Sequence, residues 1–351
     1  MKKKRVISLS ILTIVLIGLL IVFLKNKDKI YYFQRNLNSK SDVILKIYSS
    51  MDFNSLMDTV IKNEVFKNPE TFKKVATIKG YPNNIKSGLY SLKPEMNNRD
   101  IVNLLLSGNQ TPIKITILPS FNINTFASSV SKQLELDSAT IVNSYNSPET
   151  LQDLKISKND MYSLLLPNTY EFYWNVSISS FWERLKRESD IFWNEERLNK
   201  LTELNLTKLE TITLASIVEC ETNYKPERPD IAGVYINRLN RRMPLQADPT
   251  LVFIAKNGTN GTDTIRRVLN KHKAIESPYN TYKNVGLPPG PIYIPSLNSI
   301  DAVLNYNKHN YLFFCADSDM SGKHVFSKTY SQHLKYARKF QDELNKQGIY
   351  K

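Results

Sequence analysis

Two glutamates interrupt an apolar run in the segment LASIVECETNY, which spans residues 214–224. Glu219 and Glu221 stand on either side of Cys220. Burying a charged carboxylate costs several kcal/mol unless the group is paired or loses its charge. Carboxyl groups in such a run are therefore either neutralised by a partner or available for proton transfer.

A helical projection separates the two carboxyl groups. At roughly 100° per residue, Glu221 falls within the stripe of Leu214, Ile217 and Val218, and Glu219 points about 160° away. Apolar surroundings raise the pKa of a carboxyl group, which then keeps the proton that a general acid needs near neutral pH. We therefore predict that Glu221 is a catalytic acid.

A structural ion pair is the alternative for Glu221. Arg228 and Arg238 follow closely in the sequence, and either could neutralise it. The predicted helix, residues 209–222, also has apolar residues on its other sides, which weakens the argument from one stripe. Both interpretations stay open at this point.

Polar side chains that could position a substrate follow in two segments. Residues 230–250 run from a predicted helix into a turn, and residues 277–296 form a loop stiffened by prolines. Flat aromatic faces and amide groups suit the binding of sugar rings. The candidates are Asn237, Gln246, Asp248, Tyr279, Asn280 and Tyr282. A purely structural proline-rich loop is the alternative for the second segment.

The formal net charge of +14 predicts an anionic partner. The basic residues are spread along the chain, and no basic run is interleaved with aromatics in the way that suits stacked bases. This distribution favours a membrane surface or an acidic polymer over nucleic acid.

The N-terminus predicts a membrane anchor. Residues 6–24 contain no charge, and this length of helix, ~28 Å, is close to the hydrocarbon thickness of a bilayer. No small-residue cleavage site follows, so we favour an uncleaved transmembrane helix over a secretory signal. Residues 1–5 would form a short cytoplasmic tail, with the bulk of the chain outside the membrane.

The cysteines and histidines predict neither a metal site nor a cofactor. Cys220 and Cys315 are the two cysteines, too few for a disulfide framework, and they could be free or bridged. The four histidines lack metal-ligand spacing.

Strands and helices do not alternate regularly along the chain, which predicts an α+β fold. After a polar linker at 25–42, residues 43–109 read as a small α/β unit. It includes a helix from Pro69 and another with Asn98 as its cap and Gly108 as its stop. A second unit at 110–351 is mostly helical to residue 242. It is loop-rich to 298 and closes with two strands, within 311–317 and at HVFS, and a helix at about 329–346.

Several motifs in the same order carry a family resemblance. LASIVECET, VYINRL, PLQADPT, YNTY and GLPPGPI resemble those of the endolytic murein transglycosylases of the YceG-like family. SGLY, LLSG, LPNTYEFYW and HVFS add to the match, which runs from about residue 45 to the C-terminus. The resemblance implies one membrane-spanning helix, a LysM-like subdomain (here 43–109) and a catalytic domain outside the membrane (here 110–351).

Two positions depart from the family pattern. Cys220 stands where the family commonly has a lysine between the two glutamates, and Ser120 stands where a glutamate usually follows proline. The first removes a cation beside the predicted acid. The second puts any role of that position in doubt.

The resemblance implies cleavage of the bond between N-acetylmuramic acid and N-acetylglucosamine inside peptidoglycan strands, leaving 1,6-anhydromuramic ends. It also assigns Glu221, before Thr222, as the acid. Peptidoglycan strands and the membrane would be partners, and peptidoglycan synthases and division or elongation proteins are further candidates. A muramidase using Asp248 as second carboxylate, or a non-enzymatic peptidoglycan-binding scaffold, are the rival interpretations.

Overall fold

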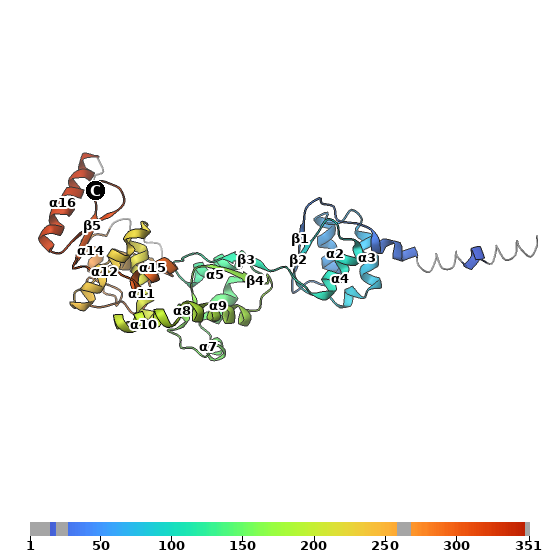
Figure 1. The fold of residues 1–351 in the computed structure, drawn as a ribbon, viewed down its shortest axis with the longest axis horizontal. Helices are drawn as coiled ribbons and strands as arrows, with labels where there is room; N and C mark the ends of the chain where they lie inside the picture. The colour runs from blue at the N-terminus through green and yellow to red at the C-terminus, as the bar shows by residue number, and fades with distance from the viewer. Residues whose placement is uncertain (1–14, 19–26, 258–267, 348–351) are drawn as a thin grey trace, which may run out of the picture. The chain divides into compact units, whose positions relative to one another are not determined.

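The computed structural model describes residues 15–18, 27–257 and 268–347. The chain divides into two compact units (Figure 1). Unit 1 comprises Met1–Lys114 with Glu171–Val176, and unit 2 comprises Ile115–Tyr170 with Ser177–Lys351. Helices dominate and the described strands form two-stranded sheets, so the predicted α+β class is confirmed.

Unit 1 consists of an antiparallel strand pair covered by three helices. β1 (Val43–Ile47) pairs with β2 (Gly88–Leu92), and Val43 lies opposite Leu92. The helices α2 (Phe53–Lys62), α3 (Pro69–Ile78) and α4 (Asn98–Ser107) pack in sequence order, and α4 also contacts β2. Leu45 and Ile47 of β1 alternate with exposed residues and join the helices in one apolar core. The short helix η2 (Tyr81–Asn83) lies between α3 and β2.

Local sequence signals set the helix ends of unit 1. The predicted start at Pro69 and stop at Gly108 are confirmed, and Gly108 has a φ of 70° that favours glycine. The predicted cap at Asn98 is wrong by one residue. Asn97 accepts the capping hydrogen bond from Asp100, because the Asn98 side chain is fully buried and donates to the carbonyl of Tyr31.

Part of the predicted linker at 25–42 packs into unit 1. The helix η1 (Lys27–Phe33) contacts α3 and α4, and Asn36 is fully buried. The Asn36 amide donates to the carbonyl of Asn68 and to the side chains of Thr71 and Asn98. These hydrogen bonds hold the segment against the N-terminal ends of α3 and α4.

The predicted tail at 1–5 and most of the predicted transmembrane helix at 6–24 lie outside the described residues. Within the ranges that the structure describes, no helix is long and apolar enough to cross a membrane.

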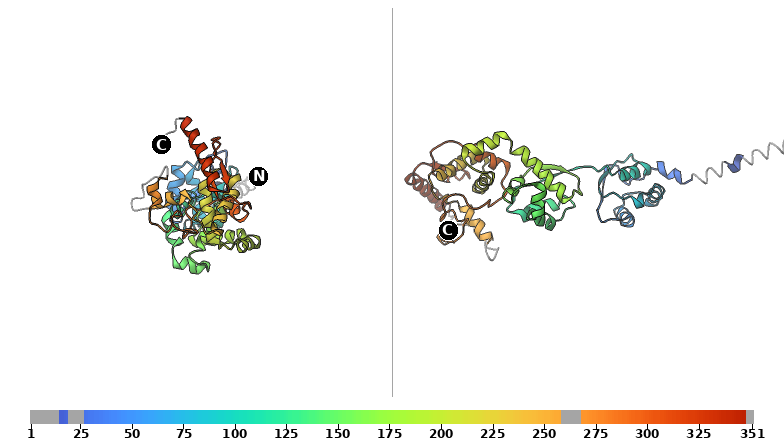
Figure 2. Two further views of the ribbon diagram at one scale, coloured as in Figure 1. Left: turned by 90° about the vertical axis from the view of Figure 1, so that its left-hand side faces the viewer. Right: turned by 90° about the horizontal axis from the view of Figure 1, so that it is seen from below.

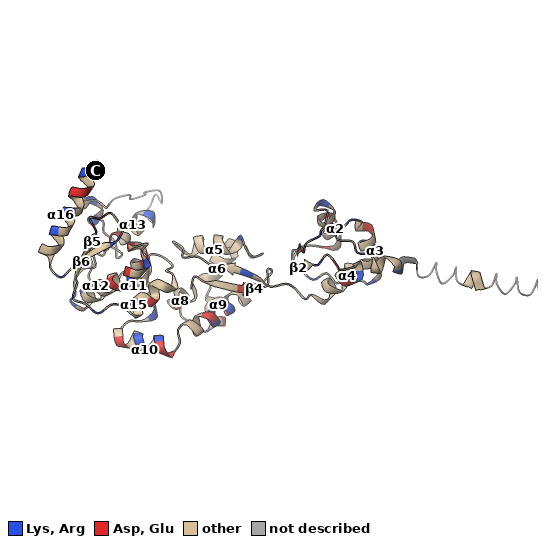
Figure 3. Ribbon diagram, turned by 45° about the horizontal axis from the view of Figure 1, so that its top comes forward, with Lys and Arg blue, Asp and Glu red and all other residues tan. Residues whose placement is uncertain are grey.

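Unit 2 begins with a helical layer beside a second strand pair, β3 (Ile113–Thr116) and β4 (Thr169–Phe172). The boundary between the units falls within both strands. The layer contains α5 (Ile123–Ser131), α6 (Ser138–Tyr145), α7 (Pro148–Leu154), α8 (Met161–Leu164) and α9 (Ile178–Phe192). Basic and acidic residues are interspersed along α9, α10 (Glu195–Leu204) and α16 (Tyr330–Lys346) (Figure 3).

The helix α11 (Lys208–Glu221) lies at the centre of the remaining part of unit 2. It contacts α8, α12 (Arg228–Asn240), α13 (Asp248–Asn257) and α15 (Leu297–Leu304). The short helices η3 (Lys225–Glu227) and α14 (Asn270–Lys273) connect them. An antiparallel pair, β5 (Phe313–Ala316) and β6 (His324–Ser327), packs against α16, the red helix near the C-terminus in the left view of Figure 2. These elements position the candidate site.

The helix α13 corrects the prediction that residues 243–298 are loop-rich. Pro249 lies in its first turn, where the missing N–H of proline is tolerated. Thr250 and Leu251 are fully buried, so packing stabilises a helix that the surrounding proline and glycine residues conceal in the sequence.

Candidate active site

The two glutamates of the opening segment lie at the C-terminal end of α11. A capping box between Thr207 and Glu210 starts this helix, and the extended backbone of Thr222 ends it. Every residue from Thr211 to Val218 is buried. The helix therefore has no single apolar face, and the partners of the two glutamates distinguish them better than the helical projection does.

Glu219 is held in a network of hydrogen-bond donors. Both terminal nitrogens of Arg228 lie 3.1 Å from its carboxylate oxygens, in a bidentate pair. The Ser296 N–H at 3.1 Å, the Ser296 hydroxyl at 2.5 Å and the Ser299 hydroxyl at 2.6 Å also donate to it. Burial alone would raise the pKa of Glu219, but these donors outweigh it and the pKa is lowered. Glu219 is thus an ionised structural group.

Glu221 has a different environment. One partner, the hydroxyl of Tyr235 on α12, donates a hydrogen bond to its carboxyl group. Burial raises the pKa of Glu221 to about 7, and the charge of Asp248 adds to the effect. The Tyr235 hydrogen bond and the charge of Arg238 oppose the rise without cancelling it. Glu221 therefore keeps a transferable proton near neutral pH.

Neither arginine considered for an ion pair neutralises Glu221. Arg228 pairs with Glu219, and Arg238 donates to the carbonyls of Leu312, Pro244 and Leu245. Among the described residues, Glu221 forms no ion pair. The arrangement agrees with the environment predicted for a catalytic acid, and the catalytic role itself stays a prediction.

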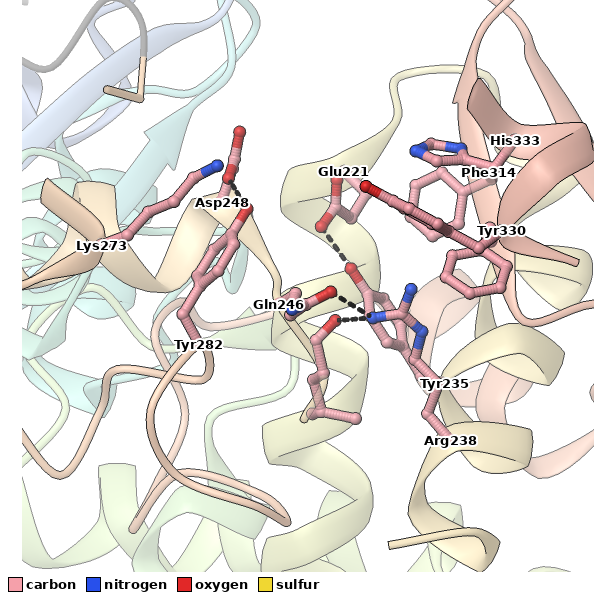
Figure 4. Close-up of a pocket in the computed structure, with 12 residues that line it drawn as sticks. Glu221, Tyr235, Arg238, Gln246, Asp248, Lys273, Tyr282, Phe314, Tyr330 and His333 are labelled. Carbon is pink, nitrogen blue, oxygen red and sulfur yellow. Dashed lines mark hydrogen bonds between the residues drawn. The ribbon is translucent and has the colours of Figure 1, made fainter. Parts of the chain in front are cut away.

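Glu221 and Tyr235 line a cavity of about 650 Å³ (Figure 4). Figure 4 shows Asp248, Lys273 and Tyr282 on one side of Glu221, and Phe314, Tyr330 and His333 on the other. The first wall comes from α13, α14 and the proline-rich loop, and the second comes from β5 and α16. Carboxyl, hydroxyl, amine and aromatic groups thus line the cavity around one carboxylic acid, as in a pocket that binds a polar ligand.

Three of the six predicted substrate-binding residues line this cavity. They are Gln246, Asp248 and Tyr282. The Tyr282 hydroxyl donates to the Asp248 carboxylate. Gln246 has a φ of 52°, unusual for a residue other than glycine, and its N–H donates to the Thr281 carbonyl at 3.0 Å. This conformation presents the Gln246 side chain at the cavity.

The other three predicted residues support the site from outside the cavity. The Asn237 amide donates to the carbonyls of His309 and Tyr311 and so fastens α12 to the chain before β5. Asn280 is fully buried; its amide donates to the carbonyls of Lys273 and Ile275, and its oxygen accepts from the Tyr282 N–H. Tyr279 packs against Phe253 with ring centroids 4.8 Å apart.

Several cavity residues were not predicted from the sequence: Tyr235, Arg238, Leu245, Lys273, Phe313, Phe314, Tyr330 and His333. Tyr235 and Arg238 lie inside the motif VYINRL, so the motif itself was a usable signal. The residues of β5 and α16 are about 90 to 110 positions from Glu221 and carried no local signal.

A second network fixes the end of α11. The buried carboxylate of Glu227 accepts hydrogen bonds from the Thr222 hydroxyl and the His324 N–H, and its other contact is the His324 ring at 2.8 Å. Thr222 directly follows Glu221, and His324 begins β6. The His324 ring also meets Phe314 edge-on, with centroids 5.3 Å apart. Glu227 thus couples the helix end to the aromatic wall of the cavity.

A second cavity, of about 640 Å³, adjoins the first at Glu221 and Asp248. Its walls are more apolar: Phe121, Pro249, Val252, Phe253, Ile292 and Tyr293, with Cys220 and Lys256. Ser120, which replaces the glutamate of the family pattern, exchanges backbone hydrogen bonds with Ile294 in an isolated bridge beside it. Cys220 and Cys315 are both free. Within the described residues, no cluster of His, Cys, Asp or Glu could hold a metal ion.

Comparisons with known proteins show the family of the chain. The model of the YceG-like family matches residues 45–339. A *Bacillus subtilis* protein named endolytic murein transglycosylase is 30% identical over 328 residues, covering 88% of this chain and 87% of that protein. A *Streptococcus pneumoniae* protein of the same name is 28% identical and matches over 84% of this chain and 58% of its own length.

A solved structure extends the comparison to the fold. The crystal structure of a yceG-like protein from *Listeria monocytogenes* superposes with a TM-score of 0.53 at 28% identity, over 85% of this chain and 99% of that one. The family match extends over parts of both units and includes every residue of the glutamate segment and of the first cavity's lining. The chain belongs to the YceG-like family.

Proposed function

We propose that the chain is an endolytic lytic transglycosylase that cleaves the bond between N-acetylmuramic acid and N-acetylglucosamine inside peptidoglycan strands. The observation that carries the proposal is the raised pKa of Glu221, about 7, in a cavity of polar and aromatic side chains. The names of the related proteins, endolytic murein transglycosylase, support the same reaction.

In the proposed mechanism Glu221 acts first as acid and then as base. Its proton goes to the glycosidic oxygen as the bond from that oxygen to C1 of the muramic residue breaks. The C6 hydroxyl of the same residue then bonds to C1 and returns its proton to Glu221. Atoms balance without water, and the product is a 1,6-anhydro end. Because the nucleophile belongs to the substrate, one carboxyl group is enough and positioning carries much of the rate.

Gln246, Asp248 and Tyr282 are the proposed positioning residues within the cavity. Their amide, carboxylate and phenol groups lie beside Glu221 and can bind hydroxyl and acetamido groups of the sugars. Tyr235 orients the Glu221 carboxyl group through its hydrogen bond. Asn237, Tyr279 and Asn280 act indirectly, by holding the backbone that presents these groups.

A muramidase is the second candidate because Asp248 lines both cavities that meet at Glu221. A hydrolase acting on the same bond needs a second carboxylate to activate water or to form a covalent intermediate. The hydrogen bond from Tyr282 to Asp248 would orient such a group. A scaffold that binds peptidoglycan without cleaving it is the third candidate.

The deciding experiment digests purified peptidoglycan with the full chain in detergent, wild type beside Glu221→Gln, and reads the products by mass spectrometry. Anhydromuropeptides from the wild type alone, each one water lighter than hydrolysis products, support the proposal. Reducing ends identify a muramidase. Binding of glycan by both proteins without any release of products identifies a scaffold.

The apolar segment at 6–24 supports the further proposal of a single-pass membrane anchor with the catalytic unit outside the membrane. We also propose that unit 1 is a LysM-like glycan-binding subdomain. Cleavage close to the membrane would end the elongation of nascent strands, which makes peptidoglycan synthases and division or elongation proteins the proposed partners. Fractionation of cells with a tagged chain tests the anchor.

A further inference from the structure

The two cavities that meet at Glu221 and Asp248 each contain one lysine. Lys273 lines the first cavity and Lys256 the second. The Nζ of Lys273 lies 5.0 Å from the ring centroid of Tyr282, and the Nζ of Lys256 lies 4.8 Å from that of Phe121. Both ammonium groups therefore rest on aromatic faces at the edge of the cleavage site.

Neither lysine forms an ion pair with any residue that the structure describes. The remaining charged groups of the cavities are otherwise engaged. Arg238 donates to backbone carbonyls, and Asp248 accepts from Tyr282. Burial and the charge of Arg238 lower the pKa of His333, so its ring is neutral at neutral pH. The unpaired positive charge on each side of Glu221 thus comes from a lysine.

The sugar backbone of an intact strand offers these ammonium groups no charge, because its rings carry hydroxyl and acetamido groups and the lactyl carboxyl group of each muramic residue forms the amide bond to its stem peptide. The stem peptides attached to the muramic residues carry carboxylates. A strand cut internally occupies both sides of the acid, so its stems can reach both cavities. We propose that Lys273 and Lys256 make the site selective for glycan strands that retain their anionic stem peptides, an inference that rests on the proposed function.

Lys273 is the better placed of the two because its backbone is fixed. Its carbonyl accepts a hydrogen bond from the buried amide of Asn280 at 3.1 Å, and Asn280 also accepts from the Tyr282 N–H. The lysine and the tyrosine beneath it are thus oriented by the same buried side chain. Asn280 is buried and lines neither cavity, so its effect on the selectivity is indirect, through the positions of Lys273 and Tyr282.

The test compares intact, uncrosslinked strands with strands from which an amidase has removed the stems and whose freed lactyl carboxylates have then been converted to neutral amides. The full chain, its Lys273→Gln and Lys256→Gln variants and the double variant are assayed for kcat/KM on both substrates. Lys283→Gln is the matched control, because Lys283 follows Tyr282 on the proline-rich loop but pairs with Glu276 and lines neither cavity. We expect the wild type to prefer intact strands, and each cavity variant to lower that preference about threefold to fivefold. The preference should also weaken as salt rises.

A binding arm separates this inference from the proposed function. Cosedimentation of Glu221→Gln with intact and stem-free strands measures the same preference without cleavage, with and without the lysine substitutions. If the wild type cleaves neither substrate, the proposed function fails and the binding arm still decides. Equal binding of the two strands, or an equal effect of Lys283→Gln, would overturn the inference.

Discussion

Glu219 and Glu221 lie two residues apart on the same helix but have different hydrogen-bond donors. A guanidinium group and two serines donate to Glu219, whereas a single tyrosine hydroxyl donates to Glu221. The first network lowers the pKa of Glu219, whereas burial raises that of Glu221. Both side chains start from the same peptide chemistry, so the difference arises entirely from what the neighbouring elements supply. The hydrogen-bond donors around a buried carboxyl group thus decide whether it is ionised and structural or protonated and able to react.

The comparison predicts its largest effect on the reaction rate. Glu221→Gln should lower the rate of anhydromuropeptide release about 10³-fold, because the amide cannot transfer a proton. Glu219→Gln should keep most of the activity per folded molecule. Assays of both variants at matched folded concentration measure the contrast, and similar losses in the two would contradict the assignment of roles.

The second prediction concerns stability. Glu219→Gln breaks a pair in which the side chain of Arg228 is only 4% exposed, and leaves that cation without a counter-charge. We expect the free energy of unfolding to fall by about 3–5 kcal/mol. Urea unfolding followed by circular dichroism measures it. A loss below about 1 kcal/mol would mean that the serines alone satisfy the site.

The third prediction follows from the raised pKa of Glu221, which moves from 4.5 in the reference state to about 7 in the folded protein. Below the lower value both states bind the proton, so the buried group costs nothing. Between pH 4.5 and about 7 the unfolded chain releases the proton while the folded protein keeps it, so stability falls as pH rises, by about 3 kcal/mol in all, and levels off above about pH 7.

Glu221→Gln removes this cost, so the variant should match the wild type near pH 4 and exceed its stability near pH 8. Unfolding curves at both values test the sign. The activity of the wild type should decline at higher pH, above about pH 7, as the folded protein's acid loses its proton. A constant difference in stability across pH would show that Glu221 titrates normally.

The smallest predicted effect comes from Tyr235→Phe. The Tyr235 hydroxyl favours the ionised form of Glu221, so its removal should raise the pKa of Glu221 further and shift the alkaline limb of the activity profile upward by less than one unit. The loss of one hydrogen bond should cost about 1 kcal/mol of stability. Tyr279→Phe, outside the cavity, serves as the control and should leave the pH profile in place.

Features set by local interactions were predicted correctly from the sequence, whereas features set by tertiary contacts were missed. Pro69 and Gly108 marked helix ends through their own backbone chemistry, and those predictions are confirmed. α13 was missed because its helix depends on the burial of Thr250 and Leu251 against other elements. The amides of Asn237 and Asn280 have the right chemistry for sugar binding, but in the fold they satisfy backbone carbonyls. The aromatic wall from β5 and α16 is formed by tertiary contact alone.

The contacts of Glu227 also bear on the order in which the molecule acquires its site. The His324 N–H, which donates to Glu227, lies 97 residues further along the chain, whereas the Thr222 hydroxyl, which also donates to it, lies only five residues away. Contacts of such long separation form late, because a large loop must close before they contribute. A chain emerging from the ribosome would thus hold the helix of Glu221 well before the hairpin that completes its surroundings. The assembled cavity is a property of the finished domain, and shortened chains that end before β6 should be inert even when their core is folded.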